Sequence, residues 1–81
     1  MTIDEVLAGQ EYPKRLVFKG VSTAVFEAGG RYHLVFASGK SWRTVPFAMH
    51  GHMEAFQMMV NELIPEYWDA LSAVSREIPS K

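Results

Sequence analysis

The sequence predicts a small α+β domain with a short N-terminal helix, a three-stranded antiparallel β-meander and a C-terminal amphipathic helix that is kinked or broken at Pro65. Three observations support this fold class. Residues 1–11 contain a helix-capping pattern, residues 14–47 are β-branched and aromatic with glycine punctuation, and residues 49–78 carry apolar residues at helical spacing. At 81 residues a second independent core is implausible, so we expect one domain over residues 1–81.

The first segment begins with a capping pattern. Thr2 is a suitable N-cap, and Glu5 three residues later completes a capping box, in which each side chain bonds the backbone N–H of the other residue. Gly9 stands where a short helix would end. We expect this helix to lie against the core through its apolar residues, which are Ile3, Val6 and Leu7.

Glycines divide the second segment into strands. The pair Gly29-Gly30 predicts a two-residue primed hairpin turn, because both positions need positive φ and glycine has no Cβ to clash. Gly20 allows two interpretations, a bulge that bends one long strand over residues 15–27 or a break that leaves the strand at residues 21–27. The bend is favoured, which gives three strands.

The order of the strands follows from their side chains. Residues 32–37 carry apolar side chains on both faces of the second strand, which favours a central position. Pro46, in the third strand, lacks a backbone donor and therefore favours an edge.

In the third segment, apolar residues recur at steps of three or four, which predicts helix. Pro65 interrupts the hydrogen-bond ladder, although the apolar phase continues through it. A continuous helix over residues 50–78 would be roughly 43 Å long, whereas a strand of seven residues spans about 23 Å. The second half therefore either folds back at Pro65 onto the same core or overhangs and meets another chain. The stripe consists of Met49, Met53, Phe56, Val60, Leu63, Tyr67, Leu71, Val74 and Ile78.

The two halves of this stripe are given different roles. The residues before Pro65 that we expect to face the sheet are Met53, Phe56, Val60 and Leu63. The residues after Pro65 extend past what a small meander covers, and they are the candidate protein interface. This interface comprises Tyr67, Trp68, Leu71, Val74 and Ile78.

Composition narrows the function classes. Without cysteine there is no disulfide, thiolate metal site or thiol catalysis, and the cytoplasm is the expected location. The N-terminal residues are acidic where a signal peptide is basic, and no apolar run approaches the roughly 18 residues of a membrane span. Secretion and membrane insertion are therefore not expected.

Charge is segregated along the chain. Residues 12–47 hold six bases and one acid, a net charge of +5, whereas residues 1–11 and 48–81 each have a net charge of −3. A basic segment with interleaved aromatic residues can hold single-stranded nucleic acid, because bases stack on aromatic rings while cations contact phosphates. This gives an alternative binding surface on the sheet, made of Lys14, Arg15, Lys19, Arg31, Tyr32, Lys40, Trp42 and Arg43.

One cluster has metal-ligand spacing, namely His50-Gly51-His52 with Glu54 nearby. A zinc site needs three or four ligands, and the remaining imidazole, His33, lies in a different element. Serines without a spaced nucleophile motif and the lack of a Gly-rich phosphate loop leave no catalytic signature. We therefore expect no metal, no cofactor, no small-molecule substrate and no enzymatic activity.

The predicted order of elements is similar to that of double-stranded RNA-binding domains. That family has a lysine cluster at the start of its last helix, where this chain has Ala48-Met49-His50-Gly51-His52. Its first helix is also longer. The sequence therefore does not predict membership.

These observations favour a non-enzymatic protein-interaction module that binds a protein partner or itself, as a homodimer, through the C-terminal helix. Opposite charge patches on one small body favour oriented docking. Adaptors and inhibitors encoded by phages and other mobile elements are of this size and composition. The alternative function is nucleic-acid binding through the basic, aromatic sheet face.

Overall fold

The computed structural model describes residues 2–9, 15–48 and 51–77, which form three helices and one sheet. None of the helices in these ranges is long and apolar enough to cross a membrane. The elements, in chain order, are α1 (Ile3–Ala8), β1 (Arg15–Lys19), β2 (Thr23–Ala28), β3 (Arg31–Ser38), β4 (Ser41–Phe47), α2 (His52–Asn61) and α3 (Tyr67–Glu77).

The sheet has four antiparallel strands in the order β1-β2-β3-β4, so the expected three-stranded meander is wrong in strand number. The bend expected at Gly20 is a complete turn, because the Gly20 N–H donates to the Thr23 carbonyl at 2.7 Å and the chain reverses. A bulge does occur, but within β1, where the register shifts between Leu16 and Phe18. The long strand over residues 15–27 is therefore two paired strands.

The rest of the meander agrees with the sequence. Gly29 and Gly30 have φ of 60° and 79° and join β2 to β3, which confirms a turn that needs positive φ at both positions. β3 lies between β2 and β4, and β4, which contains Pro46, is an edge strand. The capping box of Thr2 and Glu5 is also present.

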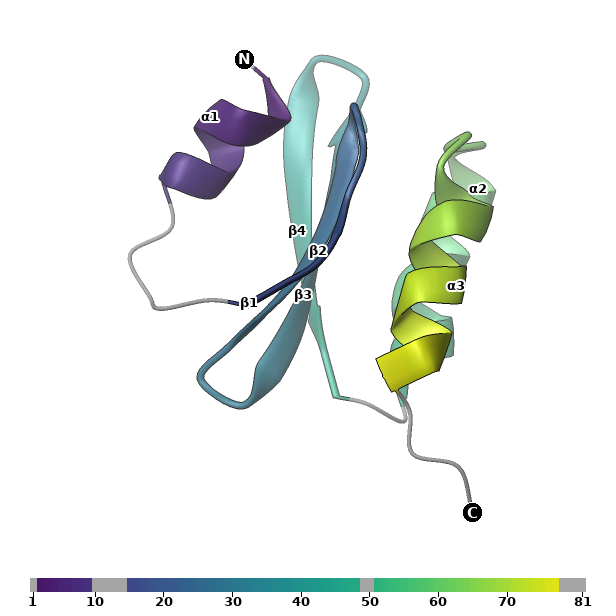
Figure 1. Ribbon diagram of the computed structural model, residues 1–81. Coiled ribbons are helices and arrows are strands. Elements are labelled where there is room, and N and C mark those ends of the chain that lie inside the picture. The colour runs from purple at the N-terminus through teal and green to yellow at the C-terminus, as the bar shows by residue number, and fades with distance from the viewer. Residues whose placement is uncertain (1, 10–14, 49–50, 78–81) are drawn as a thin grey trace.

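Helices cover both faces of the sheet (Figure 1). α1 lies on one face, while α2 and α3 lie side by side on the other. Two buried clusters result, because alternate strand residues point to opposite faces. The α1-side cluster contains Ile3, Leu7, Ala24, Phe26, Ala28 and Val35. The larger cluster, beneath α2 and α3, contains Val25, Tyr32, Leu34, Phe36, Phe47, Ala55, Phe56, Met59, Ala70 and Val74.

The C-terminal segment folds back as two separate helices instead of overhanging. α2 ends at Asn61, before Pro65, and the chain closes its last turn with a Schellman pattern. In this turn the Leu63 N–H donates to the Val60 carbonyl at 3.1 Å, and the Ile64 N–H donates to the Met59 carbonyl at 3.0 Å. The helical break therefore spans several residues, and the alternative with the fold-back is the one observed.

This break changes which residues of α2 face the sheet. Phe56 is buried as expected, but Met53, Val60 and Leu63 are 55%, 41% and 87% exposed, so their expected sheet-facing role is wrong. Ala55 and Met59 are buried beside Phe56 instead. The expectation treated the apolar stripe as one face of a single helix through Pro65. Because α3 is a separate helix, the side of α2 that faces the sheet does not have to continue the apolar face of α3.

Candidate protein-interaction surface

The structure distributes the predicted interface residues between surface and core. Trp68 is 72% exposed, whereas Val74 is 2% exposed and belongs to the larger cluster. Tyr67 and Leu71 are half-buried and pack against that cluster. Ile78 lies outside the described residues. Since α3 folds back onto the sheet, most of its apolar stripe packs against the core. Of the predicted interface residues that are described, only Trp68 projects into solvent.

An apolar hollow of about 520 Å³ lies where α2 and α3 meet. Trp68 and Leu63 line it and are strongly exposed, while Met59 is fully buried and forms part of its floor. We call this surface the α2–α3 corner, defined by Met59, Val60, Leu63, Ile64, Pro65, Tyr67 and Trp68.

Aromatic contacts connect the corner to the core. The rings of Trp68 and Tyr67 meet edge to face with centroids 5.1 Å apart, and Tyr67 meets Phe56 in the same manner at 6.0 Å. Phe56 is fully buried. Edge-to-face pairs at these distances are favourable. The exposed indole therefore packs against Tyr67, which in turn contacts the buried core.

A leucine at position 63 is unfavourable in two respects. Its φ of 56° makes it the one described non-glycine residue with positive φ, and a Cβ in this region costs about 1 kcal/mol or more. Its side chain is also 87% exposed. Glycine or asparagine is usual at this position of a helix end, so neither backbone conformation nor core packing accounts for leucine here.

Glu66 binds the backbone of the turn that carries a third exposed apolar residue, Val21. Its Oε2 accepts a hydrogen bond from the Val21 N–H at 2.9 Å, and its Oε1 accepts from the Ser22 N–H at 2.8 Å and the Ser22 hydroxyl at 2.9 Å. Val21, in the β1–β2 turn, is 87% exposed. A Cβ on Gly20 would lie 1.4 Å from Oε2, so this close approach requires glycine. The carboxylate thus joins the β1–β2 turn to the start of α3.

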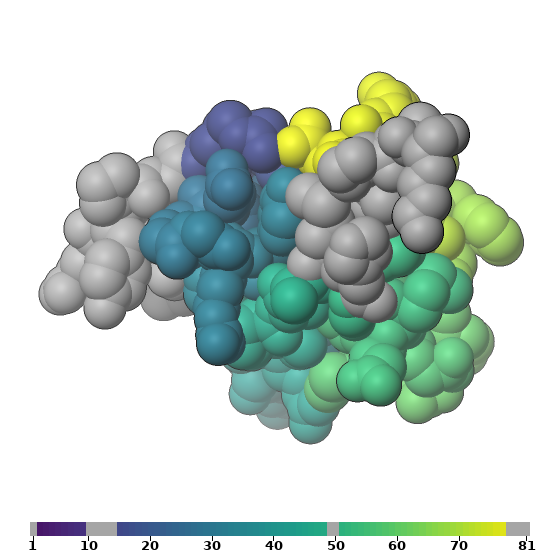
Figure 2. All heavy atoms as spheres, turned by 90° about the horizontal axis from the view of Figure 1, so that it is seen from below, coloured from purple at the N-terminus to yellow at the C-terminus, as the bar shows by residue number. Residues whose placement is uncertain are grey.

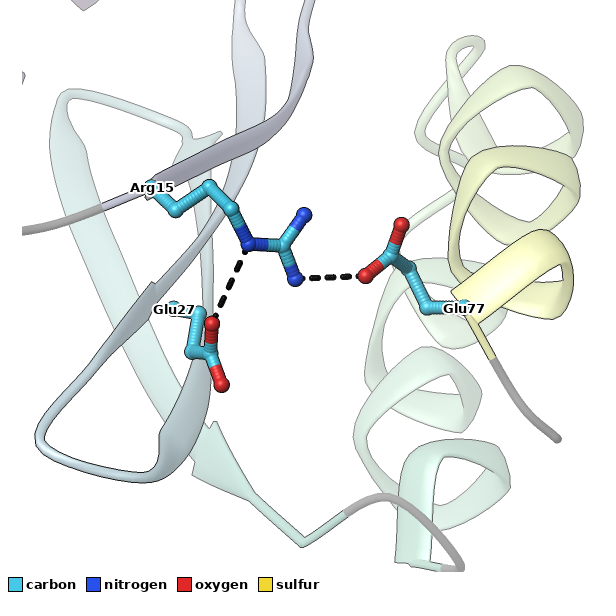
Figure 3. A network of polar contacts seen from close by, with 3 residues as sticks. All are labelled: Arg15, Glu27 and Glu77. Carbon is cyan, nitrogen blue, oxygen red and sulfur yellow. Dashed lines mark hydrogen bonds and ion pairs between the residues drawn. The ribbon is translucent and has the colours of Figure 1, made fainter.

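The cations of the predicted nucleic-acid surface are largely paired with acids. Arg15 contacts Glu27 at 3.2 Å and Glu77 at 2.5 Å (Figure 3), and these hydrogen bonds raise the pKa of its guanidinium further above its ordinary value. Lys19 pairs with Asp4.

Arg43 lies 3.9 Å from Glu62. Each of these three cations of the basic middle therefore contacts an acid from one of the acidic flanks. The charge segregation along the sequence becomes internal pairing in the fold.

The aromatic members of that surface are separated as well. Tyr32 is buried and stacks on Phe47 at 5.6 Å beneath the C-terminal helices, whereas Trp42 packs against the α1-side cluster on the opposite face. Arg31 and Lys40 lie at opposite ends of the meander. Lys14 is outside the described residues. The described members of the predicted set therefore do not form one surface.

A second hollow, of about 510 Å³, lies between the ends of β3 and β4 and the start of α2. Figure 2 views this end of the molecule, with the β2–β3 turn beside the start of α2. Of the described residues that line it, Arg31 and Glu54 are charged, and none is a serine or a histidine.

The histidine cluster does not gather ligands within the described part of the chain. No group of three or more potential metal ligands occurs there. His33 stacks on Phe26 at 5.0 Å on the α1 side of the sheet, while His52 begins α2 on the other side, and His50 is outside the described residues.

Comparison of the chain with protein-family models, with curated proteins and with solved structures finds no match.

Proposed function

We propose that this chain is a small, non-enzymatic protein-interaction module, of adaptor or inhibitor type, that binds a protein partner through the α2–α3 corner. One observation carries the proposal. Among the described residues, two of the most exposed large apolar side chains, Leu63 and Trp68, line the same hollow, and a third, Val21, lies in the turn that Glu66 joins to the start of α3. Exposed apolar side chains gathered beside a hollow are typical of binding sites, whereas isolated ones need no explanation.

The nature of the surface favours a protein ligand. Tryptophan is enriched among the residues that dominate binding energy, and such residues work best beside apolar pockets that exclude water. Leu63 adds an aliphatic side chain held in a costly backbone conformation, which is most readily explained by a role outside the monomer. The cysteine-free composition is in keeping with a cytoplasmic location for this module.

Nucleic-acid binding has less support. Base stacking requires exposed rings, but Tyr32 is buried and Trp42 is half-buried on the other face of the sheet. Arg15, Lys19 and Arg43 already contact carboxylates, which would have to be released before these cations could bind phosphate.

Site-specific photocrosslinking tests this proposal. A photoreactive phenylalanine analogue replaces Leu63 in one variant and Ser75, which is exposed near the end of α3, in the control. We expect a discrete protein adduct from position 63, none from position 75, and loss of the first adduct when Trp68→Ser is added. Adducts of equal yield from both positions, or no adduct from position 63, would contradict a specific surface at the corner.

A further inference from the structure

We propose that the protein bound at the α2–α3 corner is a second copy of this chain, and that Trp68 of each copy enters the hollow of the other. This inference rests on the proposed function and names its partner. It follows from the shape, the charge and the size of the corner.

The corner is complementary to itself. It carries both an apolar hollow and, on the rim of the same hollow, the exposed indole of Trp68. A two-fold axis beside the rim would bring each indole into the opposite hollow at once, which is the arrangement of an isologous interface. Leu63, on the same rim, would be covered by the same contact.

Charge does not oppose this contact. The formal net charge of the chain is −1, so two copies meet little long-range repulsion. Near the corner, Glu62 and Glu66 are engaged with the sheet through Ser38, Arg43 and the β1–β2 turn. The charges around the corner are of both signs, because Lys40 lies in the β3–β4 turn next to Ser38, which contacts Glu62, and Asp69 follows Trp68 on α3. A strongly acidic or basic partner has no matching patch here.

The required area is also modest for this molecule. A specific interface at the lower end of the usual range buries about 600 Å² per copy, and the chain exposes 5301 Å² in total. The corner, together with the exposed Met53 about two turns before Val60 on α2, needs to supply roughly one-ninth of that surface. We therefore expect a reversible dimer with a Kd on the order of 10 μM.

The two tryptophans of the chain make the contact measurable. Trp42→Phe leaves Trp68 as the only indole, and this background is used for both measurements. We expect sedimentation equilibrium to give twice the monomer mass as concentration rises from about 1 μM to about 1 mM. We expect the emission of Trp68 to shift to shorter wavelength over the same range, because the indole leaves water.

Matched variants separate the corner from the rest of the surface. Leu63→Ser in the same background should weaken the dimer by about 100-fold or more, because each substitution acts twice in a symmetric interface. Ser75→Ala should leave the Kd unchanged. Circular dichroism verifies that both variants are folded, which the high exposure of Leu63 and Ser75 leads us to expect.

The outcomes distinguish this inference from the function on which it rests. A dimer without a shift of Trp68 emission overturns the inference, because the contact then lies elsewhere. A monomer at about 1 mM also overturns it; a heterologous adduct from position 63 would then preserve the proposed function, and the lack of any adduct would remove both.

Discussion

The two faces of the sheet are covered very differently. Beneath α2 and α3 lies a cluster of ten buried residues drawn from three strands and both helices, whereas the α1 side has six. α1 is a six-residue helix that contributes two buried side chains, Ile3 and Leu7. Cooperative stability comes chiefly from buried apolar contacts. The larger cluster therefore supplies most of the buried apolar contact, and we expect α1 to open separately from the rest of the domain.

The largest expected effect is at the centre of the larger cluster. Phe56 is fully buried and touches both Phe47 and Tyr67 edge to face. Phe56→Ala should lower the free energy of unfolding by about 3–5 kcal/mol, since it removes apolar burial and leaves a cavity. Urea denaturation measures this loss. The control Val60→Ala, at an exposed position of the same helix, should change it by well under 1 kcal/mol, and equal effects would contradict the orientation of α2.

The α1 side should respond differently to a similar change. Leu7→Ala should cost about 2–3 kcal/mol, at the lower end for buried leucine, because the small cluster can relax by releasing α1. Hydrogen exchange resolved by residue is the measurement. Amides of α1 should lose protection while those of β2 and β3 keep it. If α1 and the sheet lose protection together, the two faces form one cooperative unit and the comparison between them fails.

Local sequence signals sufficed for much of the fold. The Gly29-Gly30 turn, the capping box and the edge position of Pro46 depend on neighbouring residues, and each was predictable for that reason. The β1–β2 turn was not, because the N–H groups of Val21 and Ser22 are satisfied by Glu66, more than forty residues later. No local pattern reveals a turn that is completed from a distant helix.

That long-range contact gives the next largest effect. Gly20→Ala should cost about 1–2 kcal/mol, because the new Cβ displaces the Glu66 carboxylate from its hydrogen bonds. Glu66→Ala should cost a similar amount for the same reason. In a double-mutant cycle, Gly20→Ala should then add almost nothing in the Glu66→Ala background. Additive losses would show that glycine is needed there for another reason.

A smaller effect of opposite sign is expected at Thr23, which pairs with Phe36 of the larger cluster across β2 and β3. Thr23 is fully buried, and its Oγ1 has no hydrogen-bond partner among the described residues. Thr23→Val keeps the shape and removes the unsatisfied hydroxyl, which should raise the free energy of unfolding by about 1 kcal/mol. Thermal unfolding detects this as a higher Tm. A lower Tm would mean that the hydroxyl does find a partner.

The candidate site was less predictable than the fold. Helical periodicity located Trp68, but it placed Val74 in the interface and Val60 and Leu63 in the core. Helical periodicity identifies the residues that share an apolar face, but it does not show which of them another part of the chain covers. The end of α2 at Asn61 and the fold-back of α3 decide which part of the stripe stays uncovered. The available signal was Pro65 itself, because helices commonly end shortly before a proline.

The smallest effect on stability is expected at Leu63 of the α2–α3 corner, which is exposed, whereas the cluster residues on both faces of the sheet are buried. Leu63→Gly should raise the free energy of unfolding by about 0.5–1 kcal/mol, because glycine adopts positive φ without a Cβ clash and the leucine packs against little. Urea denaturation measures this gain, and sedimentation equilibrium should show weaker self-association. Leu63→Ala is the matched control, because it keeps the Cβ and should lose association without gaining stability. Stability gained only with glycine, together with binding lost in both variants, would identify Leu63 as a residue that costs the monomer energy for the sake of the contact it makes. If Leu63→Gly left association intact, the strained turn would have to be explained without a partner.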